Sequence, residues 1–440
     1  MFDAGIYRRR RVELAKRMRR GVAIVSTAAQ AVRNGDSHYP FRFDSYFYYL
    51  TGFAEPGAVL AVLAEGAQSI LFCRPKDPQR EIWDGFRYGP ESAREILGFD
   101  RAYGIDKLDA MAPELLADQP VVHYAVGADK QWDERVLSWL NAVRERVRSG
   151  VGAPNEVRDL RVLLDEMRLK KGAHEINTMR RAASITAGAH RRAMQKTRPG
   201  VTEYQIEAEL IHEFRRHGAQ APAYTPIVAG GVNSCVLHYV ANNSPLRAGD
   251  LLLIDAGCEL DGYASDVTRT FPVNGRFSAA QRDVYQMVLE AQRAAITRVK
   301  PGNHWEQPHQ AALKVLVRGM IDLGLCKGSV DAVLESGDYR RFYMHRTGHW
   351  LGMDVHDVGA YKQNGKWRKL EPGMTLTVEP GCYIRPGKGV PRRLWNIGVR
   401  IEDDVLVTRD GHEILSAAAP KTVDEIETCM RVGSDAAGPG

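Results

Sequence analysis

The alternation of apolar and polar positions divides the chain into two parts. In residues 1–165, short apolar runs alternate with segments of helical periodicity, which is the pattern of an α/β domain. The segment GVGAPNEVRDL breaks this pattern at Pro154 and predicts the end of the domain nearby. Strands are expected at 23–26, 59–63, 69–73 and 121–126, and helices at 91–97 and 132–148.

Longer helical patterns open the second part, residues 166–430. Thr202 and Gln205 have the spacing of a capping box and predict the start of one helix. Short strands and Gly/Pro turns follow, and the C-terminal residues 431–440 are expected to form a disordered tail. Helices are expected at 159–171, 174–196, 202–218, 278–299 and 306–323.

Two aspartates interrupt apolar, β-prone runs in the stretch LLLIDAGCELDGYASDVTRTF. Asp261-Gly262 predicts a tight hairpin turn, because the favoured two-residue turn needs positive φ at both positions. In that register Asp255 faces Thr268, and Asp255 and Asp266 are diagonal neighbours on one face. Two ionised carboxylates there repel, so one is protonated or a cation lies between them. A pair of solvent-exposed hairpin residues is the alternative.

Composition describes an ordinary soluble globular protein of 440 residues, long enough for two domains with sizeable cores. No stretch approaches the ~20 uninterrupted apolar residues that span a bilayer, so no membrane partner is expected. The charged N-terminus lacks the apolar region of a secretory signal. Six cysteines are scattered without CxxC pairs, which favours a cytoplasmic location and no disulfides.

The net charge of +6 is modest, but basic residues gather near the N-terminus, at Arg8–Arg11 and again at 16–20. We interpret this cluster as a solvated helix face or a subunit contact. Nucleic-acid binding is the alternative, and no nucleic-acid partner is expected.

Three later stretches end strand-like runs with side chains that bind metals. MHRTGHWLGMDVHD carries His345, His349 and His356 among glycines, so a helical HxxxH zinc motif is not expected. Glu379 ends an apolar strand in MTLTVEPGCYI, and Glu402 lies between β-branched runs in IGVRIEDDVLVT. Each glutamate taken alone is also compatible with a half-exposed strand position.

Four carboxylates, those of Asp255, Asp266, Glu379 and Glu402, interrupt sequences that should be buried. Burying four unpaired carboxylates is prohibitively costly. Two divalent ions would neutralise the four negative charges, and neutral His349 would complete a set of nitrogen and oxygen ligands. Such ligation favours manganese or magnesium, with cobalt, iron or zinc as alternatives.

These five residues occur in the contexts DAG, SDVTRTF, HRTGHWLGMDVHD, TVEPG and RIEDD. In order and context they resemble the ligands of the pita-bread metallopeptidases, the group of methionine aminopeptidase, prolidase, creatinase and aminopeptidase P. The resemblance covers residues 170–425. VLHYV around His238, GCYI around Tyr383 and the N-terminal segments DSHYPFRFDSYFYYLTGFAEPGAVL and EIWDGFRYGPE resemble the aminopeptidase P type and extend the match over nearly the whole chain.

The resemblance implies an α+β fold. An N-terminal α/β domain of the creatinase type, residues 1–165, would contribute to substrate restriction and oligomer contacts. A C-terminal pita-bread catalytic domain, residues 166–430, would have a curved antiparallel sheet flanked by helices. The family also implies a homodimer or homotetramer.

The resemblance further implies a dinuclear site, with manganese as the expected metal. Asp266 and Glu402 would bridge the two ions, Asp255 would complete one of them, and His349 with Glu379 the other. A water between the metals would be the nucleophile, and Glu379 would act as its general base.

Three further histidines are candidate catalytic residues. The resemblance implies that His238 and His356 lie around the tetrahedral intermediate and the leaving nitrogen, and His345 is expected to take part in catalysis. A hydrogen-bonded core histidine is the alternative for His238, and an orienting role toward His349 or a carboxylate is the alternative for His345. The segment VAGGVNS at 228–234 lacks a phosphate-loop lysine and is interpreted as a flexible turn before a strand that carries His238.

Tyr383, Arg400 and Trp83 are the candidate substrate contacts. Arg400 shares a strand face with Glu402 and is expected to pair with a buried carboxylate or histidine. Tyr383 is alternatively a core aromatic residue. Trp83 would cap the substrate pocket of its own or a neighbouring subunit, and a buried structural tryptophan is the alternative.

The expected function is that of a metal-dependent exopeptidase that releases the N-terminal residue from peptides with proline in second position. Prolidase, which cuts Xaa-Pro dipeptides, is the enzymatic alternative. The metal-free creatinase type is disfavoured because all five ligands are present. A non-enzymatic pita-bread scaffold that binds peptide or nucleic acid is the alternative from a different class.

Overall fold

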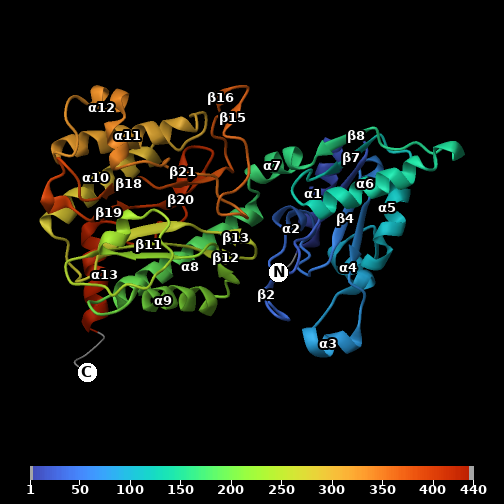
Figure 1. Ribbon diagram of the computed structural model, residues 1–440, viewed down its shortest axis with the longest axis horizontal. Helices are drawn as coiled ribbons and strands as arrows, with labels where there is room; N and C mark the ends of the chain where they lie inside the picture. Colours follow the sequence, from blue (N-terminus) through green and yellow to red (C-terminus); the bar gives the residue numbers. More distant parts are fainter. Residues whose placement is uncertain (1–2, 436–440) are drawn as a thin grey trace. The chain divides into compact units, whose positions relative to one another are not determined.

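The computed structural model describes residues 3–435. The chain divides between Met167 and Arg168 into two compact units (Figure 1). Within the described residues, no helix is both long enough and apolar enough to cross a membrane.

The first unit is built on a six-stranded sheet with the order β6-β5-β4-β1-β7-β8. β1 pairs in parallel with β7 and antiparallel with β4, so the sheet is mixed. Its interior strands are buried along nearly their whole length, as their continuous apolar runs predict. The strands are β1 (Val22–Ser26), β4 (Val59–Leu63), β5 (Ser69–Cys73), β6 (Arg101–Gly104), β7 (Val121–Tyr124) and β8 (Glu156–Asp159), and β2 (Val32–Asn34) and β3 (Ser37–His38) form a separate hairpin.

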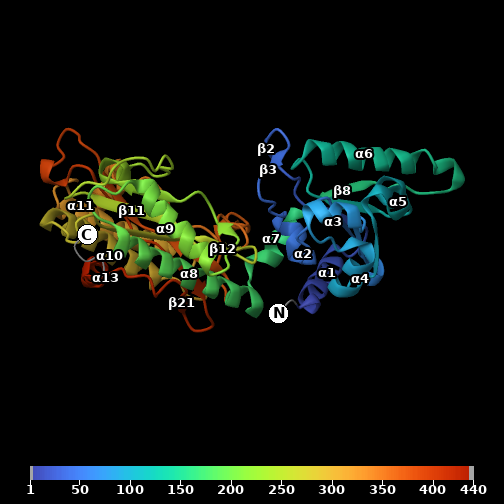
Figure 2. The same cartoon turned by 90° about the horizontal axis from the view of Figure 1, so that it is seen from below.

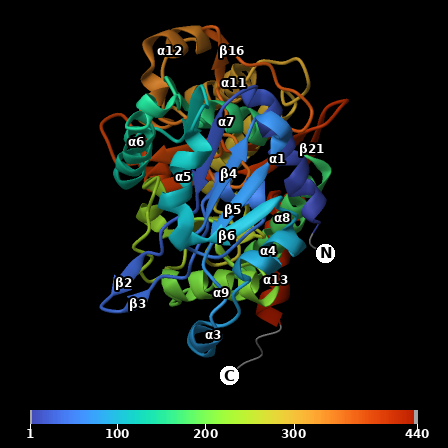
Figure 3. The ribbon, with the colours of Figure 1, turned by 90° about the vertical axis from the view of Figure 1, so that its right-hand side faces the viewer.

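Helices pack on both faces of this sheet. Figure 3 shows α5 and α6 on one side of the strands and α1 and α4 on the other. The four expected strands and both expected helices are confirmed. The apolar pattern does not predict β6 or β8, because these edge strands are polar and only partly buried. The helices are α1 (Ala4–Met18), α2 (Ser45–Thr51), α3 (Pro78–Asp84), α4 (Gly89–Leu97), α5 (Leu108–Leu116) and α6 (Lys130–Arg144).

The N-terminal basic run forms part of α1, and one of its arginines has a structural role. Arg11 is 1% exposed. Its guanidinium donates hydrogen bonds to the carbonyl oxygens of Leu50 at 3.0 Å and Gly98 at 2.5 Å, and lies 4.4 Å from the ring centroid of Phe99. Leu50 lies on α2, and Gly98 directly follows α4. Arg11 therefore ties α1 to two neighbouring helices of the same unit.

Two pairs of long helices dominate the second unit. α8 contacts α9, and α10 contacts α11. The capping box of α9 is present, with the Thr202 backbone N–H donating to Gln205 Oε1 at 2.9 Å. α13 extends to Asp435, so residues 431–435 continue a helix rather than begin the expected tail, and 436–440 lie outside the described residues. The helices are α7 (Arg161–Leu169), which spans the boundary, α8 (Ala173–Lys196), α9 (Glu203–Arg216), α10 (Ala279–Ile296), α11 (Glu306–Asp322), α12 (Val330–Ser336) and α13 (Val423–Asp435).

The strands of the second unit form small sheets in which every pairing is antiparallel, within the residues described. The orders β10-β11-β14, β17-β20-β21 and β18-β19 carry the site described below. Figure 2 shows these strands packed together with the helices of the unit, and one apolar core joins both sets of elements. The strands are β9 (Ala221–Pro222), β10 (Ile227–Gly230), β11 (Leu251–Ala256), β12 (Cys258–Leu260), β13 (Tyr263–Ala264), β14 (Val267–Pro272), β15 (Lys362–Gln363), β16 (Lys366–Trp367), β17 (Thr375–Val378), β18 (Gly381–Ile384), β19 (Ile397–Arg400), β20 (Asp403–Val407) and β21 (His412–Ile414).

The hairpin register expected from Asp261-Gly262 is confirmed. Both turn residues have positive φ, 50° for Asp261 and 78° for Gly262, and Asp255 pairs with Thr268. The ladder is interrupted at Gly257, between β11 and β12, which belong to different sheets. A Cβ atom at Gly257 would lie 1.7 Å from the carbonyl oxygen of Ser265, so only glycine fits where the two backbones approach.

We expect Gly257→Ala to lower the free energy of unfolding by about 2–3 kcal/mol, because the added methyl must displace the Ser265 backbone. Denaturant unfolding of both proteins measures the loss. Gly411→Ala is the matched control, since a Cβ there meets nothing within 4 Å. Equal stability of the two variants would contradict the close approach at Gly257.

Candidate metal centre and active site

A cavity of about 520 Å³ in the second unit collects most of the predicted site residues. They come from segments far apart in the sequence: His238 lies in a turn, and the others lie at or next to the end of a strand or in the glycine-rich segment 344–357. The predicted residues that line it are Asp255, Asp266, His349, Glu379, Glu402, His238, His345, His356 and Arg400.

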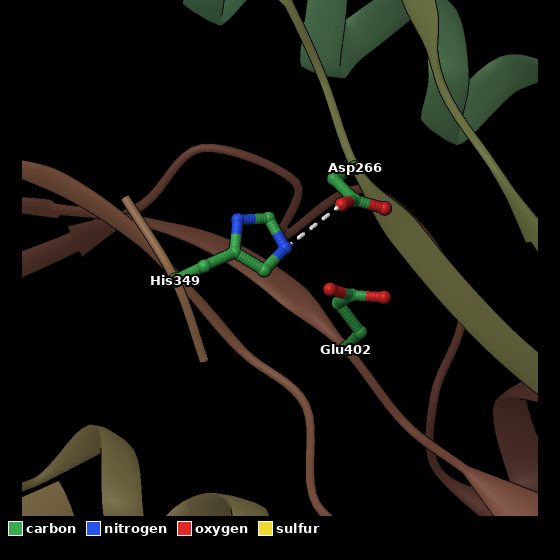
Figure 4. Close-up of side chains that lie close together, drawn as sticks. All are labelled: Asp266, His349 and Glu402. Carbon is green, nitrogen blue, oxygen red and sulfur yellow. Dashed lines mark ion pairs between the residues drawn. The ribbon is translucent and has the colours of Figure 1, made fainter. Parts of the chain in front are cut away.

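Asp266, His349 and Glu402 form the tightest group in the cavity. One ligand atom of each lies within 4.8 Å of the others (Figure 4). His349 Nε2 is 3.3 Å from Asp266 Oδ2 and 3.7 Å from Glu379 Oε1. A divalent cation with oxygen and nitrogen ligands fits such a set of buried, converging donors.

Asp255 and Asp266 do converge on one face, as the hairpin register predicts. A single hydroxyl, that of Tyr224, contacts both: it is 2.5 Å from Asp255 Oδ1 and also within hydrogen-bond distance of Asp266 Oδ1. One O–H can donate only one hydrogen bond at a time, so Tyr224 satisfies only one of the two carboxylates at any moment. Tyr224 is absent from the sequence prediction, because a tyrosine in a turn segment before β10 carries no distinguishing pattern.

Arg400 provides the positive charge beside Asp255. Its guanidinium donates to Asp255 Oδ2 at 2.6 Å, to the Tyr383 hydroxyl at 3.0 Å and to Thr268 Oγ1 at 3.2 Å. Thr268 in turn donates to Glu402 Oε2 at 2.6 Å. The expected pairing of Arg400 with a buried carboxylate is therefore present, and Thr268 links it to a second one.

The four carboxylates differ in their electrostatic environments. Burial favours the neutral form of Asp255, but Arg400 and the Tyr224 hydroxyl outweigh it and lower its pKa. Burial and the charge of Asp255 raise the pKa of Asp266. Burial, followed by repulsion from the neighbouring carboxylates, raises the pKa of Glu402 well above its usual range. Burial raises the pKa of Glu379 to about 7. Burial is the first cause of all three raised pKa values, and repulsion between the carboxylates adds to it.

The histidines of the cavity also differ. Burial lowers the affinity of His349 for a proton, but Asp266 and Glu379 outweigh it and raise its pKa to about 9. Burial, with the charge of Arg400 next, lowers the pKa of His345 to about 4. His349 Nδ1 lies 2.9 Å from the carbonyl oxygen of Trp350, which leaves Nε2 facing the carboxylates.

The other predicted residues differ in whether they line the cavity. His345 Nε2 lies 2.9 Å from the Tyr383 hydroxyl, and Tyr383 is buried behind the cavity without lining it. The rings of His349 and His356 have centroids 4.3 Å apart. The prediction of a strand around His238 is wrong: the residue is exposed and lies in a turn after a short 3₁₀ segment.

Trp83 is not the buried tryptophan of the alternative interpretation. It projects from α3 of the first unit with 83% of its surface exposed, next to exposed Ile82 and Phe86. It is not among the described residues that line the cavity.

Each part of the chain matches the model of a known protein family or domain. Residues 177–409 match the model of metallopeptidase family M24, and residues 7–123 match the model of the aminopeptidase P N-terminal domain. Xaa-Pro aminopeptidase of Haemophilus influenzae is 48% identical over 400 residues, which are 90% of each chain.

Solved structures of similar proteins superpose on this chain over nearly its whole length. The aminopeptidase PepP of Pseudomonas aeruginosa superposes with a TM-score of 0.97 at 49% identity and covers 99% of each chain. Zinc-substituted aminopeptidase P of Escherichia coli, in complex with product, gives a TM-score of 0.96 at 44% identity and covers 98% of this chain and 99% of that one. The expected fold class is thereby confirmed, and the chain belongs to metallopeptidase family M24.

Proposed function

We propose that this protein is a metal-dependent Xaa-Pro aminopeptidase, which removes the N-terminal residue from peptides with proline in second position. The observation that carries the proposal is the convergence of four buried or partly buried carboxylates and His349 in one cavity. The M24 family and the similarity to Xaa-Pro aminopeptidases over at least nine-tenths of the chain support it.

Two divalent ions fit this donor set. Asp255, Asp266, His349, Glu379 and Glu402 would hold them. Bound divalent ions supply Lewis acidity, which lowers the pKa of a water and polarises a carbonyl. We propose manganese, because carboxylate oxygens dominate the set.

Glu379 is the proposed general base. In the metal-free protein burial raises the pKa of Glu379 to about 7, so its carboxylate binds a proton more readily than an exposed glutamate does. The water that attacks the scissile carbonyl would give its proton to Glu379. Breaking the C–N bond then requires a proton on the leaving nitrogen, since a proline nitrogen has no hydrogen in the peptide.

The histidines around the cavity complete this chemistry. We propose that His238 and His356 contact the tetrahedral intermediate and the leaving group. His345, held by the Tyr383 hydroxyl, would stay neutral, because its pKa is lowered to about 4 by burial first and by Arg400 next. Neutral His345 can offer one N–H donor without adding positive charge to the site.

Asp255 explains why the enzyme would act only at a peptide terminus. A free N-terminal amine would approach this carboxylate and its ion, whereas an internal amide has no charge to pair. Arg400 holds Asp255 in place at 2.6 Å and is a proposed substrate contact together with Tyr383. We further propose that Trp83 contacts substrate at the site of a neighbouring copy in a homodimer or homotetramer, and that the protein is cytoplasmic.

Hydrolysis of Arg-Pro-Pro and Gly-Pro separates the proposed function from its rivals. After chelation we expect no cleavage, and after addition of Mn²⁺ we expect arginine to be released from Arg-Pro-Pro. Cleavage confined to Gly-Pro would assign a prolidase. A metal-loaded protein that cleaves neither peptide would instead support the scaffold, for which salt-dependent retention on nucleic acid is the next test.

The role of Glu379 is tested by Glu379→Gln, which keeps the size of the side chain but cannot accept a proton at neutral pH. We expect kcat to fall by about 10²–10⁴. Glu371→Gln is the control, because Glu371 is an exposed partner of Lys170. Metal content is measured on both variants, and an unchanged kcat in the metal-loaded Glu379→Gln protein would contradict the assignment.

Metal affinity should depend steeply on pH. Metal ligands bind in their deprotonated forms, and the pKa values of metal-free His349 and Glu379 are raised to about 9 and about 7. Below pH 9 the metal must displace a proton from His349, so the affinity for Mn²⁺ should fall about tenfold for each unit by which the pH is lowered. Below pH 7 the fall should be steeper, because Glu379 is then protonated as well. Titration calorimetry between pH 6 and 8.5 measures this slope. A constant affinity across that range would show that neither group is a ligand.

A further inference from the structure

Glu203, the first residue of α9, holds together a segment that lines the cavity. It is fully buried. Its Oε1 accepts hydrogen bonds from the Gly230 backbone N–H at 2.8 Å and Asn233 Nδ2 at 3.0 Å. Its Oε2 accepts from the Tyr239 hydroxyl and the Ser244 backbone N–H, both at 2.8 Å. A buried carboxylate is stable in such a place only because several donors satisfy its oxygens.

These donors lie on both sides of His238 in the chain. Gly230 and Asn233 precede it, and Tyr239 and Ser244 follow it, so one carboxylate closes the segment 230–244 into a loop. Leu237, His238 and Val240 of that loop line the cavity. Within the described residues the His238 ring makes no hydrogen bond to the protein, so the backbone of the loop determines where the ring lies.

We propose that Glu203 is a positioning residue for the reaction: by fixing the loop 230–244 from both sides, it directs His238 toward the substrate. This inference rests on the proposed function, because it assigns Glu203 a part in that chemistry. Glu203 itself contacts the loop and is not among the residues that line the cavity.

All four partners donate to Glu203, and two of them, the backbone N–H groups of Gly230 and Ser244, cannot act as acceptors. Glutamine offers one acceptor oxygen and one NH₂ group, so in Glu203→Gln the NH₂ group would face one of these two backbone donors. Buried donors left without acceptors are costly, and the loop would move to relieve them.

Other contacts keep the loop attached when this carboxylate is lost. Arg385 donates to the carbonyl oxygen of Cys235 at 2.6 Å, and the Gly398 backbone N–H donates to Ser234 Oγ at 3.1 Å. At the far end, Asn242 accepts a hydrogen bond from the Val228 backbone N–H at 3.0 Å. Glu203→Gln is therefore expected to fold, with the loop displaced rather than detached.

A double-mutant cycle on the full-length, Mn²⁺-loaded protein tests the proposal, with Arg-Pro-Pro as substrate. Glu203→Gln should lower kcat/KM by about 10–100-fold, mainly through kcat, because a shift of about 1 Å at a reacting group costs that much. In a His238→Ala background the same change should cost less than about twofold, because the positioned ring is gone. Glu209→Gln, on the same helix and paired with Arg192, is the control and should be neutral.

Hydrogen exchange of the variants gives a readout that does not depend on activity. Glu203→Gln should speed exchange of the Gly230 and Ser244 amides by about tenfold or more and leave the interior of α9 unchanged. Unchanged exchange would overturn the proposal, as would equal losses of kcat/KM in both backgrounds. A further outcome is that the metal-loaded wild type cleaves no Xaa-Pro peptide while Glu203→Gln still speeds hydrogen exchange in the loop. That result would contradict the proposed function, and with it the catalytic role of Glu203, but not the contact between Glu203 and the loop.

Discussion

The structure depends on one electrostatic constraint: several buried or partly buried carboxylates share one cavity. Arg400 compensates Asp255 and lowers its pKa, whereas the pKa values of Asp266, Glu379 and Glu402 are raised by burial and mutual repulsion. Charges of one sign at such distances persist in a fold only when cations or protons balance them. Divalent metal ions would provide that balance and at the same time the chemistry of peptide hydrolysis.

The surrounding fold brings these carboxylates together. Antiparallel strands end at the cavity and hold the four carboxylates at or next to their ends, whereas His349 lies in the glycine-rich segment 344–357. Glycine at position 257 allows the two strands that carry Asp255 and Asp266 to approach closely. His238 lies in a loop, and Glu203 supplies from outside the cavity the rigidity that a strand would have given.

Much of the site could be predicted because its signals are local. The Asp261-Gly262 turn sets the register that brings two aspartates together, and acidic residues inside apolar strands are conspicuous. Tyr224 could not be predicted, since its role depends on a contact between segments 31 residues or more apart. The strand expected at His238 was wrong because its apolar neighbours suit a turn packed on a cavity equally well, and the edge strands β6 and β8 carry too few apolar residues to be recognised.

The most direct test of this account is the number of divalent ions that the folded protein binds. Equilibrium dialysis against Mn²⁺ at pH 8, followed by elemental analysis, should find two ions per chain for the wild type and fewer for Asp266→Asn, which removes a proposed ligand. A folded protein that binds no divalent ion under these conditions would show that protons, not metals, balance the buried carboxylates, and the account would be wrong.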